Sequence, residues 1–323
     1  MSPAVLGLTL YPFDLDTPAL VRLVQQAEAA GFDAAFVVEQ GVANDAMAAV
    51  MAIAVATRRI TVGPGIANLY LRHPALLGAA AVAVDEVSGG RLVLGIGTNN
   101  AGMIGALDLP WAEPRAALRS ATEWLRTVFT GGTAPGLRGP FRAARRPIPI
   151  HFAGVALETA ALAGEIADGL MLYLATPARV RQVLERLRAA AAAAGRPATA
   201  VPATLLVPTF LSDDLAAARG AARRFLTRYA SMPLYTKMFR RSGFVAETDA
   251  VAAAVARGDA AAAGAGISDR MLDEVLLVGP LARCRERLAA FREAGADFPL
   301  IAPQPIGEPT EAGIGRAIAA FAP

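Results

Sequence analysis

Cysteine, histidine and lysine are nearly absent from this chain of 323 residues. It has one cysteine, Cys284, two histidines, His73 and His151, and one lysine, Lys237. A single cysteine cannot form an intramolecular disulfide, and two histidines without an HExxH motif or a carboxylate cluster offer little for a metal to bind. We therefore expect no metal site. Lys237 lies outside every predicted strand, which argues against a Schiff-base aldolase.

Long apolar runs and clustered positive charge are also missing. Although 54% of the residues are hydrophobic, no uncharged apolar run reaches the roughly 18 residues that a membrane span needs. The chain starts without a basic segment followed by an apolar signal core. Its net charge is only +3, and its arginines are spread along the sequence. We expect a soluble, cytoplasmic protein that binds neither membranes nor nucleic acid.

Short apolar strands alternate with amphipathic helices along most of the chain, which indicates the α/β class with parallel strands. The count of eight strands favours a closed (β/α)8 TIM barrel over an open sheet. We expect one domain over 1–323, because no linker rich in Ser, Pro or Gly divides it, and a helical insertion before strand eight at about 231–273. The predicted strands are 5–10, 34–38, 60–67, 92–96, 148–152, 169–173, one within 201–211, and 298–302.

The carboxyl ends of barrel strands form one mouth, where such folds place their chemistry. Strands 60–67 and 92–96 end in glycines and small polar residues, so we expect bare backbone there that a flat ligand can approach. Without a strong nucleophile, a metal or a Schiff-base lysine, the chemistry is expected to come from a bound organic cofactor. Gly95-Ile96-Gly97 lacks the GxGxxG spacing of a dinucleotide fold and follows a fourth strand, so a Rossmann site is not expected.

Several motifs resemble those of bacterial luciferase-like proteins and occur in the same order. They are AAGFD (29–33), ATRRI (56–60), RHPA (72–75), DEVSGGR (85–91), LGIG (94–97) and AGEIADG (163–169), continued by 229–244 and LVG (277–279). The sequence looks closest to the branch that uses deazaflavin coenzyme F420, which includes methylenetetrahydromethanopterin reductase and glucose-6-phosphate dehydrogenases. The resemblance implies an F420-dependent oxidoreductase that exchanges a hydride between deazaflavin C5 and a small organic substrate, by reduction of a C=C, C=N or C=O bond.

The resemblance also implies how the cofactor is held. The tricyclic ring would lie in the barrel mouth, beside a cis peptide at Gly65–Ile66 in a bulge of strand three. Glu39 resembles the acidic residue near the deazaflavin, and Gln40 stands where relatives often have histidine. The positions that would touch the cofactor are Leu10, Glu39, Gln40, Gly65, Ile66, Asn68, Gly97, Thr98, Asn99, Ala153, Gly154, Val155 and Ala156.

Two departures from the family pattern bear on the ligands. Asn100 replaces the acidic proton donor of the sugar-phosphate dehydrogenases, which argues against glucose 6-phosphate as substrate. After strand five, where relatives hold the cofactor phosphate with backbone amides, this chain has Ala156-Leu157-Glu158. Glu158 would repel a phosphate if it pointed inward, so we expect it to face solvent.

Three residues are candidate proton donors, namely Glu39, His151 and Tyr173. Each also has a purely structural interpretation, as a carboxylate at a strand end or as a side chain that simply packs. Two other functions stay open, an FMN-dependent luciferase-like monooxygenase and a non-catalytic flavin-binding relative. The resemblance further implies a homodimer.

Overall fold

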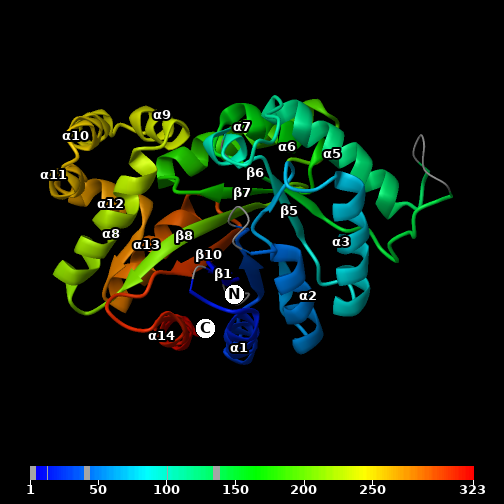
Figure 1. Cartoon of the computed structure of the whole chain (residues 1–323), viewed down its shortest axis with the longest axis horizontal. Coiled ribbons are helices and arrows are strands. Elements are labelled where there is room, and N and C mark those ends of the chain that lie inside the picture. Colours follow the sequence, from blue (N-terminus) through cyan, green and yellow to red (C-terminus); the bar gives the residue numbers. More distant parts are fainter. Residues whose placement is uncertain (1–4, 13, 40–43, 100, 134–138) are drawn as a thin grey trace.

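Nine parallel strands lie on the continuous path of the sheet (Figure 1). The computed structural model describes residues 5–12, 14–39, 44–99, 101–133 and 139–323. Along the sheet the strands follow the order β3-β2-β1-β10-β8-β7-β6-β5-β4. Their bounds are β1 (Gly7–Leu10), β2 (Ala34–Val37), β3 (Thr61–Pro64), β4 (Ala67–Asn68), β5 (Leu94–Gly97), β6 (Ile150–Ala153), β7 (Gly169–Tyr173), β8 (Ala203–Leu211) and β10 (Phe298–Pro303).

The path closes on itself because its two ends belong to one strand. β3 and β4 are consecutive segments of the stretch predicted as strand three, interrupted at the cis peptide between Gly65 and Ile66. β3 pairs with β2, while β4 pairs with β5, so the eight predicted strands form a barrel. The predicted (β/α)8 fold is confirmed. β9 (Leu277–Gly279) pairs with β8 outside this path.

Helices surround the strands, as expected for parallel strands with helical crossovers (Figure 1). Several begin at a side-chain cap, for example Asp16 before α1, Asp45 before α2 and Thr176 before α7. One short helix in the loop after β5 was not predicted. The helix bounds are α1 (Thr17–Ala29), α2 (Ala46–Ala56), α3 (Pro74–Ser88), α4 (Ala101–Gly105), α5 (Pro114–Phe129), α6 (Leu157–Ile166), α7 (Pro177–Ala193), α8 (Leu215–Ala230), α13 (Leu281–Glu293) and α14 (Thr310–Phe321).

Alternate residues of each strand pack on opposite sides of the barrel wall. On β7, Leu170 and Leu172 pack in the layer between strands and helices, whereas Met171 belongs to a second cluster inside the barrel. Partly buried Ile66 and Tyr173 pack against that inner cluster. Residues near the carboxyl ends of the strands whose side chains point into the barrel therefore lie at the mouth.

Three aspartates tie neighbouring strands together at the amino end of the barrel. Asp33, Asp168 and Asp297 immediately precede β2, β7 and β10. Their carboxylates accept hydrogen bonds from the backbone N–H of Leu6 (3.0 Å), Ile150 (3.0 Å) and Ala203 (2.8 Å), each at the start of an adjacent strand. This end of the barrel is thus built for stability.

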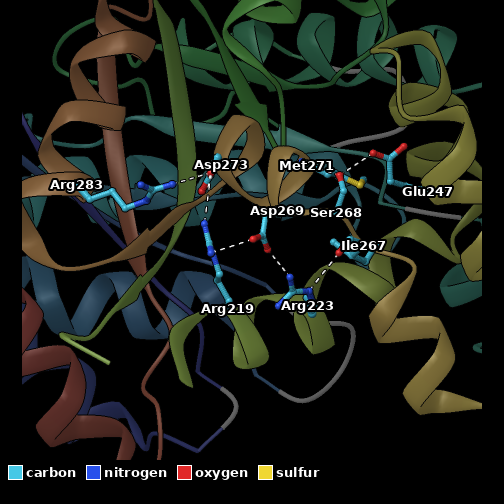
Figure 2. A network of polar contacts seen from close by, with 9 residues as sticks. All are labelled: Arg219, Arg223, Glu247, Ile267, Ser268, Asp269, Met271, Asp273 and Arg283. Atoms are coloured by element: carbon cyan, nitrogen blue, oxygen red, sulfur yellow. Dashed lines mark hydrogen bonds and ion pairs between the residues drawn. The ribbon is translucent and has the colours of Figure 1, made fainter. Parts of the chain in front are cut away.

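The predicted insertion is helical and is attached to α8 by charged contacts. It comprises α9 (Pro233–Arg241), α10 (Val245–Ala256), α11 (Ala260–Ala265) and α12 (Asp269–Val275). Figure 2 shows Asp269 between Arg219 and Arg223 of α8, with the Arg219 pair at 2.9 Å. Asp273 of α12 also bonds Arg283 of α13 at 2.6 Å. The network joins α12 to α8 and to α13. Among the described residues, no helix is long and apolar enough to cross a membrane.

Candidate active site at the barrel mouth

Glu39 is buried and already fully engaged by its neighbours. Its side chain is 0% exposed. One carboxylate oxygen accepts a hydrogen bond from the Asn68 backbone N–H, and the other from Arg72, both at 2.7 Å. Burial raises the pKa of Glu39 above its ordinary value, and the contacts with Asn68 and Arg72 partly offset that rise. With both oxygens occupied, Glu39 is suited to fix the end of β2 against β4. Its predicted role as proton donor stays a prediction.

Asn68 offers an unused hydrogen-bond donor at the end of β4. Its side chain is completely buried, and its Oδ1 accepts a bond from the Tyr70 backbone N–H at 3.0 Å. Its Nδ2 has no hydrogen-bond partner within the described part of the chain. A buried amide donor without a partner is costly, so it is suited to a ligand acceptor. The carbonyl oxygens of a deazaflavin or flavin ring are acceptors of that kind.

The cis peptide at Gly65–Ile66, implied by the resemblance, is present. A Cβ added at Gly97 would lie 3.0 Å from Ile66 and 3.3 Å from Ala153. Gly97 on β5, Ala153 on β6 and Ile66 at the β3–β4 break, all predicted cofactor positions, are therefore close neighbours. Ile66 and Ala153 also share the inner cluster with Tyr173.

We expected the glycines of strands 60–67 and 92–96 to leave bare backbone for a ligand, and this expectation is wrong for Gly63 and Gly95. A Cβ at Gly63 would lie 2.0 Å from the carbonyl oxygen of Val93, and a Cβ at Gly95 would lie 2.3 Å from that of Pro64. Both glycines thus make room for the protein's own backbone, because the strands approach each other closely there.

A cluster of tyrosines covers one side of the mouth, and only Tyr173 among them was predicted as a site residue. The hydroxyl of Tyr11, which follows β1, donates to the hydroxyl of Tyr173 at the end of β7 (2.8 Å). The ring of Tyr173 meets Tyr229 of α8 and Tyr235 of α9 edge to face, with centroids 5.4 and 6.1 Å apart. The insertion and α8 therefore supply aromatic rings to the site, a long-range arrangement that no local sequence pattern reveals.

His151 points into the barrel, but it lies below the mouth, where the chemistry is expected. It is two residues before Ala153 on β6, so it lies about 7 Å further from the mouth. Its ring packs over Gly169, where an added Cβ would lie 2.4 Å from Nε2. Burial lowers the pKa of His151 to about 4. His151 is therefore neutral at physiological pH and is not brought together with Tyr173.

The loop between β6 and α6 leads into a helix N-terminus that has no side-chain cap, and it contacts a buried arginine. Ala156 precedes α6 without a side-chain cap. Arg179 of α7, which is 6% exposed, donates to the Val155 carbonyl oxygen at 2.8 Å, while its Nε has no partner among the described residues. Helix N-termini and arginines both attract phosphate. Glu158 is exposed, as expected, and the arginine was missed because it lies on the following helix.

The remaining predicted positions are less informative. Leu10 is completely buried in the layer between strands and helices, so its side chain faces away from the mouth. Asn99 has a left-handed φ of 55° in the turn after β5, and Thr98 beside it is partly buried. Gln40 and Asn100 lie outside the described residues.

The sequence profile described as luciferase-like monooxygenase matches residues 9–297. The chain belongs to this family. This luciferase-like protein is 28% identical over 313 residues to the 5,10-methylenetetrahydromethanopterin reductase of Archaeoglobus fulgidus, covering 93% of each chain.

Two solved structures show the same fold. The coenzyme F420-dependent tetrahydromethanopterin reductase of Methanopyrus kandleri superposes with a TM-score of 0.83 at 21% identity, covering 99% of this luciferase-like chain and 98% of the other. The monooxygenase RslO1 of Streptomyces bottropensis superposes with a TM-score of 0.72 at 22% identity, covering 98% and 97%.

Proposed function

We propose that this protein is a coenzyme F420-dependent oxidoreductase that transfers a hydride between deazaflavin C5 and a small organic substrate. When bound, the deazaflavin supplies the hydride. The observation that carries the proposal is the buried Asn68 Nδ2, an unused donor at the carboxyl end of β4 beside Ile66. Further support comes from the reductase of Archaeoglobus fulgidus, which is related over nearly the whole chain.

In this proposal, different residues of the mouth bind different parts of the cofactor. Asn68 and the Ile66–Gly97–Ala153 contact would hold the ring, and Glu39 with Arg72 would keep the β2 and β4 ends in place. The open N-terminus of α6 and Arg179 would hold the phosphate. The buried aromatic surround would exclude water and orient the substrate.

Titration of the purified protein with F420 and, separately, with FMN tests the proposal. We expect saturable quenching of F420 fluorescence and weak or no binding of FMN. Tight binding of FMN alone, with oxygen consumption when it is reduced, would instead establish the monooxygenase function. Tight binding of F420 without turnover of any acceptor would indicate a non-catalytic relative.

Replacing Arg179 with methionine is expected to weaken F420 binding about tenfold, because a phosphate would lose a charged donor near the α6 N-terminus. Arg292→Met is the matched control, since Arg292 also donates to a main-chain carbonyl, that of Val5 (3.0 Å), but at the amino end of the barrel. Fluorescence titration gives both dissociation constants. Equal affinity in the two variants would remove Arg179 from the cofactor site.

We also propose a homodimer formed through the outer faces of α2 and α3. These helices pack side by side (Figure 1), and α2 has no charged side chain. Val55 on α2 is 57% exposed, and on α3 Leu76 is 67% and Val87 49% exposed. The support for this proposal is the presence of exposed apolar side chains on both helices, at the C-terminal end of α2 and at both ends of α3.

The paired substitution Val55→Arg and Leu76→Arg is expected to convert the dimer to a monomer, because it places unpaired charges in the contact. Light scattering during size-exclusion chromatography measures the mass of each species. Leu234→Arg, at an exposed leucine of α9, is the control and should stay dimeric. A monomeric wild-type protein would contradict this assignment.

A further inference from the structure

The hydroxyls of Tyr11 and Tyr173 meet above the barrel opening. Tyr11 follows β1, and Tyr173 ends β7. These two strands are not neighbours, because β10 and β8 lie between them in the barrel. A 2.8 Å hydrogen bond between their hydroxyls therefore bridges part of the opening instead of running along the wall. Tyr173 is partly buried, and it packs on the same inner cluster as Ile66.

Tyr173 is held firmly in this position. Its ring is flanked edge to face by Tyr229 and Tyr235, whose own centroids are 5.1 Å apart. The next residue, Leu174, has a left-handed φ of 52° although it is not glycine, and its side chain is buried. A non-glycine residue keeps this backbone conformation only where the surrounding packing enforces it.

The other two candidate donors are poorly arranged for proton transfer at the mouth. Both oxygens of Glu39 already accept hydrogen bonds, and its side chain is fully buried. His151 lies deeper in the barrel, and its low pKa leaves no imidazolium at neutral pH. Burial raises the pKa of Tyr173 well above its ordinary value, so its hydroxyl keeps its proton at any physiological pH.

We propose that Tyr173 is the proton donor of the reaction, that Tyr11 positions it and returns its proton, and that the acceptor is a C=O or C=N group. The inference rests on the proposed function. When the acceptor carbon gains a hydride, which the reduced deazaflavin would supply, the π electron pair of the acceptor moves to its oxygen or nitrogen. That atom takes the Tyr173 hydroxyl proton. The phenolate left behind takes the proton of Tyr11, which is restored from solvent.

The residues around the pair are mainly aromatic but include a cation, because Arg228 donates to the Tyr229 hydroxyl at 3.3 Å and lies over the Tyr229 ring. Its charge partly offsets the rise in the pKa of Tyr11 that burial causes. The alkoxide or amide anion that reduction would otherwise leave is far more basic than a phenolate, so Tyr173 can supply the proton although its own pKa is raised. The rings of Tyr229 and Tyr235 border Tyr173, and Phe225 packs on Tyr229 with ring centroids 5.0 Å apart. An apolar ketone or cyclic imine is therefore the substrate class that we assign to the site.

The test compares Tyr173→Phe and Tyr11→Phe with the wild type, with reduced F420 as donor and cyclohexanone and 1-pyrroline as acceptors. Tyr173→Phe keeps the ring and should reduce kcat on both acceptors about 100-fold. Its residual rate should fall as pH rises, since the proton must then come from solvent, whereas the wild-type rate should be flat near neutral pH. Tyr11→Phe should slow the reaction about fivefold. Tyr70→Phe is the matched control, because the Tyr70 hydroxyl donates to Ala112 and should leave all rates unchanged.

Fluorescence titration of each variant with oxidised F420 gives a readout that does not depend on turnover. We expect unchanged affinity in Tyr173→Phe, together with an unchanged melting temperature. Wild-type rates in Tyr173→Phe would overturn the inference. A wild-type protein that binds F420 but reduces neither acceptor would also overturn it. Neither result would contradict the cofactor assignment. A wild-type protein that does not bind F420 overturns the proposed function itself.

Discussion

Arg72→Met is expected to lower the free energy of unfolding by about 3–5 kcal/mol at neutral pH, because it leaves the buried carboxylate of Glu39 without its partner. The Arg72–Glu39 contact is 2.7 Å, and Arg72 itself is only 16% exposed, so solvent cannot replace the lost charge. Glu39 retains the backbone hydrogen bonds from Asn68 and Ala46, but its pKa is raised by burial even with these bonds and Arg72 in place, so they do not offset the lost charge.

The loss should depend on pH in a defined direction. Burial already raises the pKa of Glu39 in the folded state, and removal of Arg72 raises it further. A carboxyl whose folded pKa is raised binds its proton more tightly in the folded state, so it destabilises the fold as pH increases above its ordinary pKa of 4.5. The gap between variant and wild type should therefore be small at about pH 4.5 and large at about pH 8.

Urea unfolding at both pH values measures the gap. Adding Glu39→Gln to the Arg72→Met variant removes the unpaired charge, and it should recover much of the stability and abolish the pH dependence. A gap of the same size at both pH values would show that Arg72 acts through packing instead of charge.

Gly63→Ala is expected to be at least as damaging, since the added Cβ would lie 2.0 Å from the Val93 carbonyl oxygen. The colliding atom belongs to the backbone of the neighbouring strand, so no side-chain rotation relieves the overlap. The two strand segments must separate, at a cost of about 3 kcal/mol or more.

Gly264→Ala provides the matched control for this substitution. Gly264 lies in α11, and an added Cβ would have no atom within 4 Å. There the change should be neutral or stabilise the protein by up to about 1 kcal/mol. The midpoints of urea unfolding compare the two variants, and similar midpoints would mean that β3 and β5 can separate without penalty.

The barrel could be predicted from the sequence because strand and helix patterns are local. The motifs that carry the family resemblance are equally local, and the structure shows that several of them build the amino half of the barrel. In AAGFD, Asp33 bonds the β1 edge, and in ATRRI the N–H groups of 58–60 all donate to Glu28. In DEVSGGR, Arg91 donates to the carbonyls of Ala54 and Ile60. These motifs therefore reveal the fold and say little about the substrate.

The site was predicted only where it lies at strand ends. Asn68, Gly97 and Ala153 could be predicted at the mouth because each directly follows a predicted strand, whereas Ile66 was predicted from the family resemblance. The aromatic rings of Tyr229 and Tyr235 come from α8 and the insertion, and Arg179 comes from the helix after β7. Their positions depend on tertiary packing between helices and strands, which no local pattern encodes; the ion pairs between α12 and α8 are a contact of the same long-range kind (Figure 2). Alternation along a strand indicated that His151 points inward, but it could not give its depth.

A crystal structure of the protein with bound F420 tests the central claim most directly. We expect the deazaflavin ring at the carboxyl ends of the strands, in contact with Ile66 and with a ring carbonyl accepting a hydrogen bond from Asn68 Nδ2. The phosphate should lie at the N-terminus of α6. A ring bound away from the barrel mouth, or an Asn68 Nδ2 still without a partner in the complex, would contradict the account.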